Sequence, residues 1–194
     1  MQRGSAAGGL AWRRNSVSPR APVSFRPDPD QVALGSALAA RVMEVTRLTA
    51  EAMLAAGLVE LATHRFAKPI HDVHALTTRT IARFLVTGQG TTEAERNFVA
   101  RLGFLAARNG LCLTTLTRSY LLWRDINLRI LNEEIRRLRI AVAASELARM
   151  IIRSSADTGI LRMARAYDAI DLHVAALPAV LVAASPKQLT ASAV

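Results

Sequence analysis

The stretch from Arg108 to Glu134 limits the possible folds of this chain more than any other part of its sequence. It reads as a helix that ends at Gly110, a very short link, and a second helix that continues to about Leu138. Apolar side chains occupy more than one side of this second helix, so other elements must cover much of its circumference. The sequence therefore predicts a hairpin whose second helix is central to the domain, with Tyr120 and Trp123 at least half buried in the core.

The composition favours helices over sheets. Hydrophobic residues make up 51% of the 194 residues but aromatic residues only 5%, so the core must be aliphatic and rich in alanine. Such residues suit close-packed helices, whereas strands favour β-branched and aromatic side chains. The length allows one domain with a substantial core. We therefore expect a single all-α domain.

The expected domain has a tail on each side. Residues 1–29 contain scattered Gly, Pro and Arg without a helical period, and we expect them to form a flexible basic tail. The helical domain is expected over residues 30–170, with Asp30 as the first cap and one helix running from there toward Gly57. Residues 171–194 are rich in Ala, Val and Pro, and are expected to form a poorly ordered tail.

Local signals mark several helix ends inside this domain. Thr92 and Glu95 have the spacing of a capping box, in which each side chain accepts a backbone hydrogen bond from the other residue. Gly88 and Gly90 precede them in a segment with little to bury, which indicates a loop. The last helix is expected to begin near Ser145.

Residues for metal or covalent chemistry are sparse. His71 and His74 are three residues apart, a spacing that can share a metal on one helix face, and His64 lies seven residues before His71. No Cys or carboxylate cluster completes a four-ligand site, so we expect ordinary surface or boundary histidines, no metal and no cofactor. The sequence has no nucleophile elbow, phosphate-binding loop or dinucleotide motif, so we expect no catalytic residue and no enzymatic activity.

The chain is expected to act in the cytoplasm and away from membranes. Its longest apolar run, residues 174–184, is interrupted by Pro178 and is far shorter than the roughly 20 residues that cross a bilayer. The single cysteine, Cys112, cannot form an internal disulfide, which fits a reducing compartment. We expect its small side chain to be buried or half-buried.

A helix-turn-helix that reads DNA is the alternative interpretation of the hairpin. With Gly110 as the turn glycine, one face of the second helix would enter the major groove. A net charge of +10 is compatible with nucleic acid, although part of it lies in the N-terminal tail. Against this alternative, Asn109 and Ser119 would occupy positions that should be apolar, and the second helix is longer than groove reading needs. The groove-facing residues would be Thr114, Thr115, Thr117 and Arg118.

The run from Ala107 to Tyr120, followed by Trp-Arg-Asp from residue 123, resembles the A-x-x-G-[VL]-x-[LI]-x-x-L-x-R-x-Y hairpin of RsbR-type N-terminal sensor domains. These domains precede bacterial stress regulators, PucR-type transcription factors and some diguanylate cyclases. The resemblance extends loosely over residues 32–168. It implies a globin-like, haem-free helical bundle that dimerises and passes a signal to an output domain. The motif and core residues of the hairpin are Gly110, Leu116, Arg118, Tyr120 and Trp123.

The chain departs from this family in two respects. Cys112 stands where the family has a small capping residue, and no output domain is expected after the final helix, as in a free-standing module or a truncated relative. We expect a non-enzymatic sensor that binds a regulatory protein partner or an unknown small ligand and responds by a change in helix packing.

The final helix is expected to form a homodimer interface. It carries a stripe of apolar and small residues, along which a second copy could approach closely. On this interpretation Gly159→Leu would separate the two copies and leave the helical content nearly unchanged. The interface candidates are Ile152, Ala156, Gly159, Ile160, Met163 and Tyr167.

Overall fold

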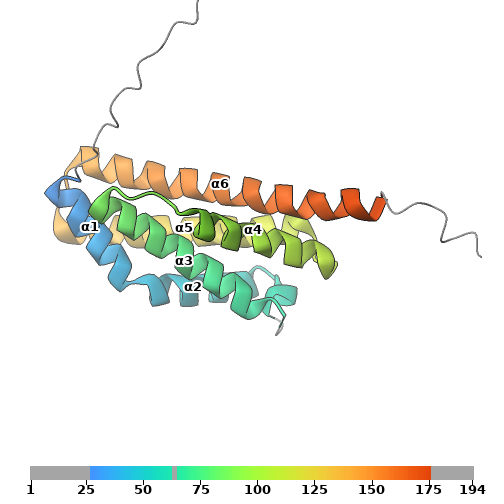
Figure 1. Cartoon of the computed structure of the whole chain (residues 1–194). Helices are drawn as coiled ribbons and strands as arrows, with labels where there is room; N and C mark the ends of the chain where they lie inside the picture. Colours follow the sequence, from blue (N-terminus) through green and yellow to red (C-terminus); the bar gives the residue numbers. More distant parts are fainter. Residues whose placement is uncertain (1–26, 63–64, 176–194) are drawn as a thin grey trace, which may run out of the picture.

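The computed structural model describes residues 27–62 and 65–175, the last five of them as backbone only. These residues form six α-helices and one short 3-10 helix (Figure 1), and no strand occurs among them, which confirms the all-α prediction. No helix in this described part is long and apolar enough to cross a membrane. The elements are α1 (Pro29–Ala40), α2 (Val42–Ala55), η1 (Val59–Ala62), α3 (Ala67–Thr87), α4 (Glu93–Arg108), α5 (Leu113–Leu138) and α6 (Val142–Ala175).

Helix α5 is central, as the hairpin predicts. It contacts all of the other described α-helices, and α6 runs beside it along the length of the molecule (Figure 1). Its buried residues recur every three or four positions, which places them on one continuous stripe. The stripe consists of Leu116, Ser119, Tyr120, Trp123, Asn127, Ile130, Leu131 and Glu134.

Asp28 caps the first helix, two residues before the predicted cap Asp30. The Asp28 carboxylate accepts a 2.9 Å hydrogen bond from the backbone N–H of Gln31, and the Gln31 side chain accepts one in return from the backbone N–H of Asp28. This pair is a capping box. Asp30 instead accepts a 2.8 Å hydrogen bond from the backbone N–H of Ala141, immediately before α6. Asp30 therefore connects α1 to the start of the last helix.

The long first helix expected from the sequence is in fact two helices, separated at Arg41. The Arg41 backbone has φ −102° and ψ 11°. Its guanidinium lies 2.7 Å from Glu44 of α2, and 2.8 and 3.0 Å from Glu133 and Glu134 of α5. The apolar spacing continues across the break and so gave no sign of it. These ion pairs fix the start of α2 against the end of α5.

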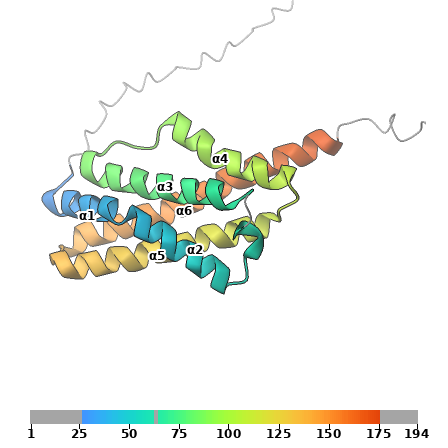
Figure 2. The same ribbon diagram turned by 90° about the horizontal axis from the view of Figure 1, so that it is seen from below.

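Helices α4 and α6 make the most extensive contact between elements, and Figures 1 and 2 both show them side by side. Glycines allow α6 to approach its neighbours closely. A Cβ atom on Gly103 of α4 would lie 2.0 Å from the carbonyl oxygen of Met163. A Cβ atom on Gly159 of α6 would lie 2.6 Å from the ring of Tyr120. Neither position has room for a larger side chain unless a neighbour moves.

This packing contradicts the predicted dimer interface. An apolar stripe shows that a helix face is covered, but it does not show by which element. Here α4 and α5 of the same chain cover the stripe of α6, so its buried members cannot face a second copy. The homodimer itself stays a prediction. Of the candidates, Ile152, Ala156, Gly159 and Met163 are buried, while Ile160 and Tyr167 are partly buried against the core.

The ends of the domain differ slightly from expectation, and one internal boundary is confirmed. Helix α6 begins at Val142 rather than Ser145 and continues to Ala175, five residues past the expected boundary at residue 170. Residues 1–26 of the expected basic tail and residues 176–194 of the expected C-terminal tail lie outside the described residues. The capping box of Thr92 and Glu95 at the start of α4 is present as predicted.

Candidate functional site

The motif residues of the predicted hairpin lie at the α4–α5 turn and in the first half of α5. Gly110 has a φ of 69°, the left-handed conformation that favours glycine. Leu116, Tyr120 and Trp123 are fully buried, so the predicted core position of the two aromatic residues is confirmed. Arg118 is exposed and donates only a long hydrogen bond of 3.4 Å, to a backbone carbonyl at the end of α2.

The start of α5 is more exposed than expected. Cys112 is exposed rather than buried or half-buried, and it lies at the N-cap position immediately before the first turn of α5. Of the residues proposed to face DNA in the alternative interpretation, Thr114 and Arg118 are exposed, and Thr115 and Thr117 are partly buried. Beyond these residues the helix enters the core.

A cluster of three rings occupies the core between α3 and α5. The centroid of the His74 ring lies 5.5 Å from that of Tyr120 and 6.0 Å from that of Trp123, and the latter two are 5.1 Å apart. His74 is fully buried, so it is not the surface or boundary histidine expected from the sequence. Neither of its ring nitrogens has a hydrogen-bond partner among the described residues. Burial, and secondarily the charge of His71, lowers the pKa of His74 to about 3.

The structure does not bring the predicted histidines together. His74 points into the core, whereas His71 lines a separate open hollow of about 900 Å³ between α2, α3 and α4. His64 lies outside the described residues. Within the described part of the chain, no three His, Cys, Asp or Glu side chains are grouped so that they could hold a metal ion.

Hydroxyl groups of α3 hold the two aromatic rings of α5. Trp123 Nε1 donates a 3.0 Å hydrogen bond to Thr78 Oγ1, and the Tyr120 hydroxyl lies 3.0 Å from Thr77 Oγ1. The Thr77 hydroxyl also donates a 2.8 Å hydrogen bond to the carbonyl oxygen of Val73. A hydroxyl has only one proton to donate. Tyr120 must therefore be the donor to Thr77, and its own oxygen remains able to accept.

A cavity of about 210 Å³ lies between α3, α4 and α6, with Tyr120 of α5 on its wall. Leu76 and Ile81 of α3 and Val99 of α4 supply an apolar part of its lining. Thr91, in the loop between α3 and α4, closes part of the same cavity. Because the cavity reaches the aromatic cluster, anything that fills it is in contact with the centre of the domain.

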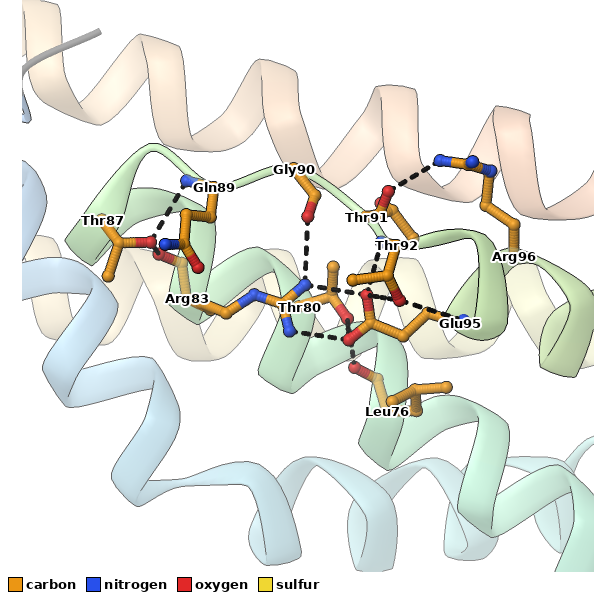
Figure 3. Close-up of polar contacts among 10 residues, drawn as sticks. All are labelled: Leu76, Thr80, Arg83, Thr87, Gln89, Gly90, Thr91, Thr92, Glu95 and Arg96. Carbon is orange, nitrogen blue, oxygen red and sulfur yellow. Dashed lines mark hydrogen bonds and ion pairs between the residues drawn. The ribbon is translucent and has the colours of Figure 1, made fainter. Parts of the chain in front are cut away.

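The loop of residues 88–92 is fixed by Arg83 and Glu95 (Figure 3). The Glu95 carboxylate accepts hydrogen bonds from Arg83 at 2.7 and 2.8 Å and from the backbone N–H of Thr92 at 2.7 Å, and Arg83 also donates to the carbonyl of Gly90. Arg83 is the main cause that lowers the pKa of Glu95 to about 2. Glu95 is thus an ionised carboxylate surrounded by the protein's own donors, which suits a structural role.

The α6 side of the cavity carries four polar residues: Ser154, Ser155, Thr158 and Arg162. Their spacing places them on one face of the helix. None of their side chains has a hydrogen bond or ion pair with any other described residue. Desolvation, followed by the nearby charge of Arg96, lowers the pKa of Arg162 below its usual range. Since no carboxylate among the described residues neutralises Arg162, this face of the cavity is positively charged.

These four residues were not singled out in the sequence, although a signal was present. Hydroxyl or guanidinium groups recur at residues 154, 158 and 162, a four-residue spacing within a helix that was read only for its apolar stripe. Many other hydroxyls in the described helices behave differently, because they donate to the carbonyl of the preceding turn. Those that do so include Thr46, Thr49, Thr77, Thr78, Thr80 and Ser145.

Comparisons of this chain with protein-family models, with curated proteins and with solved structures find no match.

Proposed function

We propose that this protein is a non-enzymatic regulatory domain in which the contents of the cavity determine how α6 packs against α4 and α5. The resemblance of its α4–α5 hairpin to that of RsbR-type sensor domains supports a sensory role. The lining supports binding rather than covalent chemistry, because its one carboxylate, that of Glu95, is already paired with Arg83.

The observation that carries this proposal is the position of Tyr120. Its side chain lines the cavity, its hydroxyl is hydrogen-bonded to Thr77 of α3, and its ring lies against Gly159 of α6. A Cβ atom at Gly159 would be 2.6 Å from the Tyr120 ring, so ring and helix have no slack between them. A displacement of the ring from the cavity side must therefore displace α6 as well.

The α4–α6 contact extends this coupling along the molecule. Gly103 of α4 approaches the backbone of Met163 closely, one turn beyond Gly159 on α6. Packed interfaces of this kind shift between discrete arrangements because they cannot deform continuously. We therefore expect a change at Tyr120 to alter the packing of α6 on α4 and to reach the C-terminal part of α6.

Hydrogen exchange of a cavity-filling variant tests the proposal. Ser155→Phe places a ring in the cavity, and Ser36→Phe, at an exposed position of α1, is the matched control. We expect Ser155→Phe to change exchange several-fold in α6 and in the Gly103 region of α4, and to leave α2 unchanged. Hydrogen exchange in the control, Ser36→Phe, should equal that in the original chain.

The comparison of α6 with α2 separates a packing change from a loss of stability. If exchange in Ser155→Phe rose equally in α2, α4 and α6, the variant would simply be less stable. That result, or α6 exchange identical to that of the original chain, would refute the proposed coupling between the cavity and α6.

Reading of DNA by the α4–α5 unit is the alternative function. The link between the two helices is short, and Thr114 and Arg118 are exposed at the start of α5. The remainder of α5 is less compatible with a groove, because its stripe from Leu116 to Glu134 is covered by other helices. A mobility-shift titration decides this point: affinity that falls steeply with salt and is weakened by Arg118→Ala would favour DNA binding.

A further inference from the structure

We propose that the cavity between α3, α4 and α6 binds a small organic carboxylate, whose charged group lies against Arg162 and the hydroxyls of Ser154, Ser155 and Thr158. This inference rests on the proposed function, because it assigns a ligand class to the cavity through which the domain would respond. It is carried by the charge balance, the free donors, the apolar lining and the size of the cavity.

The charge balance favours an anion. Arg83 and Glu95 neutralise each other at 2.7 Å, and Arg96 donates a 2.7 Å hydrogen bond to the carbonyl of Thr91. Arg162 lines the cavity and has no acidic partner among the described residues. The partial burial that lowers the pKa of Arg162 also strengthens its attraction for a bound negative charge. The cavity therefore has a positive charge that a bound anion would neutralise.

The hydroxyl groups beside Arg162 supply further donors. Ser154, Ser155 and Thr158 lie on the same face of α6, and none forms the backbone hydrogen bond that is common for hydroxyls elsewhere in this protein. A carboxylate is an acceptor with two oxygens and several lone pairs, so it can accept from a guanidinium and from hydroxyls at once. An ammonium group would find a like charge and no free carboxylate there.

The apolar part of the lining indicates that the ligand carries carbon as well as charge. Leu76, Ile81 and Val99 of α3 and α4 also line the cavity, and a fully hydrated inorganic anion gains nothing from such a surface. Tyr120 contributes an oxygen that can only accept, since its proton is committed to Thr77. A hydroxyl on the ligand would satisfy this acceptor. Hydroxycarboxylates therefore fit the cavity best.

The size of the cavity suits a ligand of a few carbon atoms. A volume of about 210 Å³ equals that of roughly seven water molecules, at about 30 Å³ each. A drug-sized molecule needs a pocket of at least about 300 Å³. Short-chain hydroxycarboxylates lie within this limit.

Isothermal titration calorimetry on the full chain tests the inference with three probes. The probes are 3-hydroxybutyrate, 1,3-butanediol, which has a similar carbon skeleton without the carboxylate, and inorganic phosphate, an oxyanion without the apolar part. We expect saturable binding of 3-hydroxybutyrate, with an affinity at least about tenfold higher than for the diol or for phosphate, because a charge-assisted hydrogen bond is lost with the diol and the apolar contact with phosphate.

Variants of α6 assign the site. Arg162→Gln should weaken 3-hydroxybutyrate binding about tenfold or more, whereas Arg162→Lys, which keeps the charge, should retain part of the affinity. Arg165→Gln is the matched control, because it removes one exposed arginine from the same helix without touching the cavity. Equal circular dichroism and equal melting temperature of Arg162→Gln and Arg165→Gln would show that a loss of binding is not a loss of fold.

Each outcome bears on the inference. Failure of 3-hydroxybutyrate to bind, or binding unaffected by Arg162→Gln, overturns it, and so does tighter binding of phosphate or of the diol. The proposed function fails separately: if 3-hydroxybutyrate binds in an Arg162-dependent way but hydrogen exchange in α6 does not change, the site stands without the coupling. If Ser155→Phe alters α6 exchange but no carboxylate binds, the coupling stands and the ligand class is wrong.

Discussion

Single residues at the centre of the domain combine tight packing with unequal hydrogen bonding. Trp123 and Tyr120 are buried and each has a threonine partner on α3. His74, whose ring packs against both of them, is equally buried but has no hydrogen-bond partner among the described residues. The sequence predicted the burial of the two aromatic residues from their place on a helix that is apolar on several sides. It did not predict that of His74, because a histidine at a helical spacing suits a surface as well as a core.

Trp123→Ala should lower the free energy of unfolding by about 3 to 5 kcal/mol, the range for removal of a large buried aromatic side chain. The variant loses the ring contacts with His74 and Tyr120 and leaves Thr78 without its indole donor. Urea unfolding followed by circular dichroism measures the change. A change near zero would mean that Trp123 is exposed and that α5 is not the core helix.

His74 should make the protein less stable in acid. Its pKa is about 3 in the folded chain against an ordinary value of 6.5, so between these values the unfolded chain binds a proton that the folded chain does not. His74 therefore causes no loss of stability above about pH 6.5. Between pH 6.5 and pH 3 the free energy of unfolding falls by about 1.4 kcal/mol for each unit that the pH falls. Glu95, with a folded pKa of about 2 against 4.5, adds to this loss only below pH 4.5.

His74→Phe separates the two contributions. Phenylalanine keeps a ring beside Trp123 and removes both unpartnered nitrogens, so stability at pH 7 should be retained or slightly increased. Urea unfolding between pH 7 and pH 4.5 should then be nearly independent of pH, whereas the original chain loses stability as the pH falls below about 6.5. An unchanged pH dependence in the variant would assign the acid sensitivity to other groups.

Among the elements, helix ends with local chemical signals could be predicted, and the pairing of helix faces could not. Three helix ends depend only on nearby residues, so the sequence was enough to predict them. They are the start of α4 at the capping box of Thr92 and Glu95, and the ends of α3 and α4 at Gly88 and Gly110. At the break, Arg41 is paired with Glu133 and Glu134, more than ninety residues away, and the apolar spacing crosses the break without interruption. The cavity likewise depends on residues from four helices that only the folded chain brings together.

Gly103→Ala should lower the free energy of unfolding by about 2 kcal/mol or more, although alanine favours helices by about 1 kcal/mol over glycine. The added Cβ would lie 2.0 Å from a backbone oxygen of α6, which cannot rotate away as a side chain could. Gly90→Ala is the control, because nothing lies within 4 Å of the position of its Cβ. Equal melting temperatures for the two variants would contradict the close α4–α6 contact.

In the molecule as a whole, the last helix packs inside its own domain instead of forming the predicted dimer interface. Its apolar stripe was predicted to meet a second copy, yet α4 and α5 of the same chain cover it. The stripe alone could not distinguish these cases, because both require the same apolar residues. Gly159→Leu is now expected to disturb Tyr120 and lower stability and helical content, rather than to divide a dimer. Light scattering of this variant and of the original chain, with circular dichroism, distinguishes the two effects.

The central claim is that the cavity sets the position of α6, and a spin-label distance measures this most directly. In a Cys112→Ser background, labels at Ala39→Cys of α1 and Asp168→Cys of α6 occupy exposed positions on the two helices. Helix α1 and the C-terminal part of α6 lie toward opposite ends of the molecule (Figure 1). Filling the cavity by Ser155→Phe should move the mean distance by about 1 to 2 Å, the usual size of a helix shift, while Ser36→Phe should not. A distance distribution that is the same in all three chains would contradict the account.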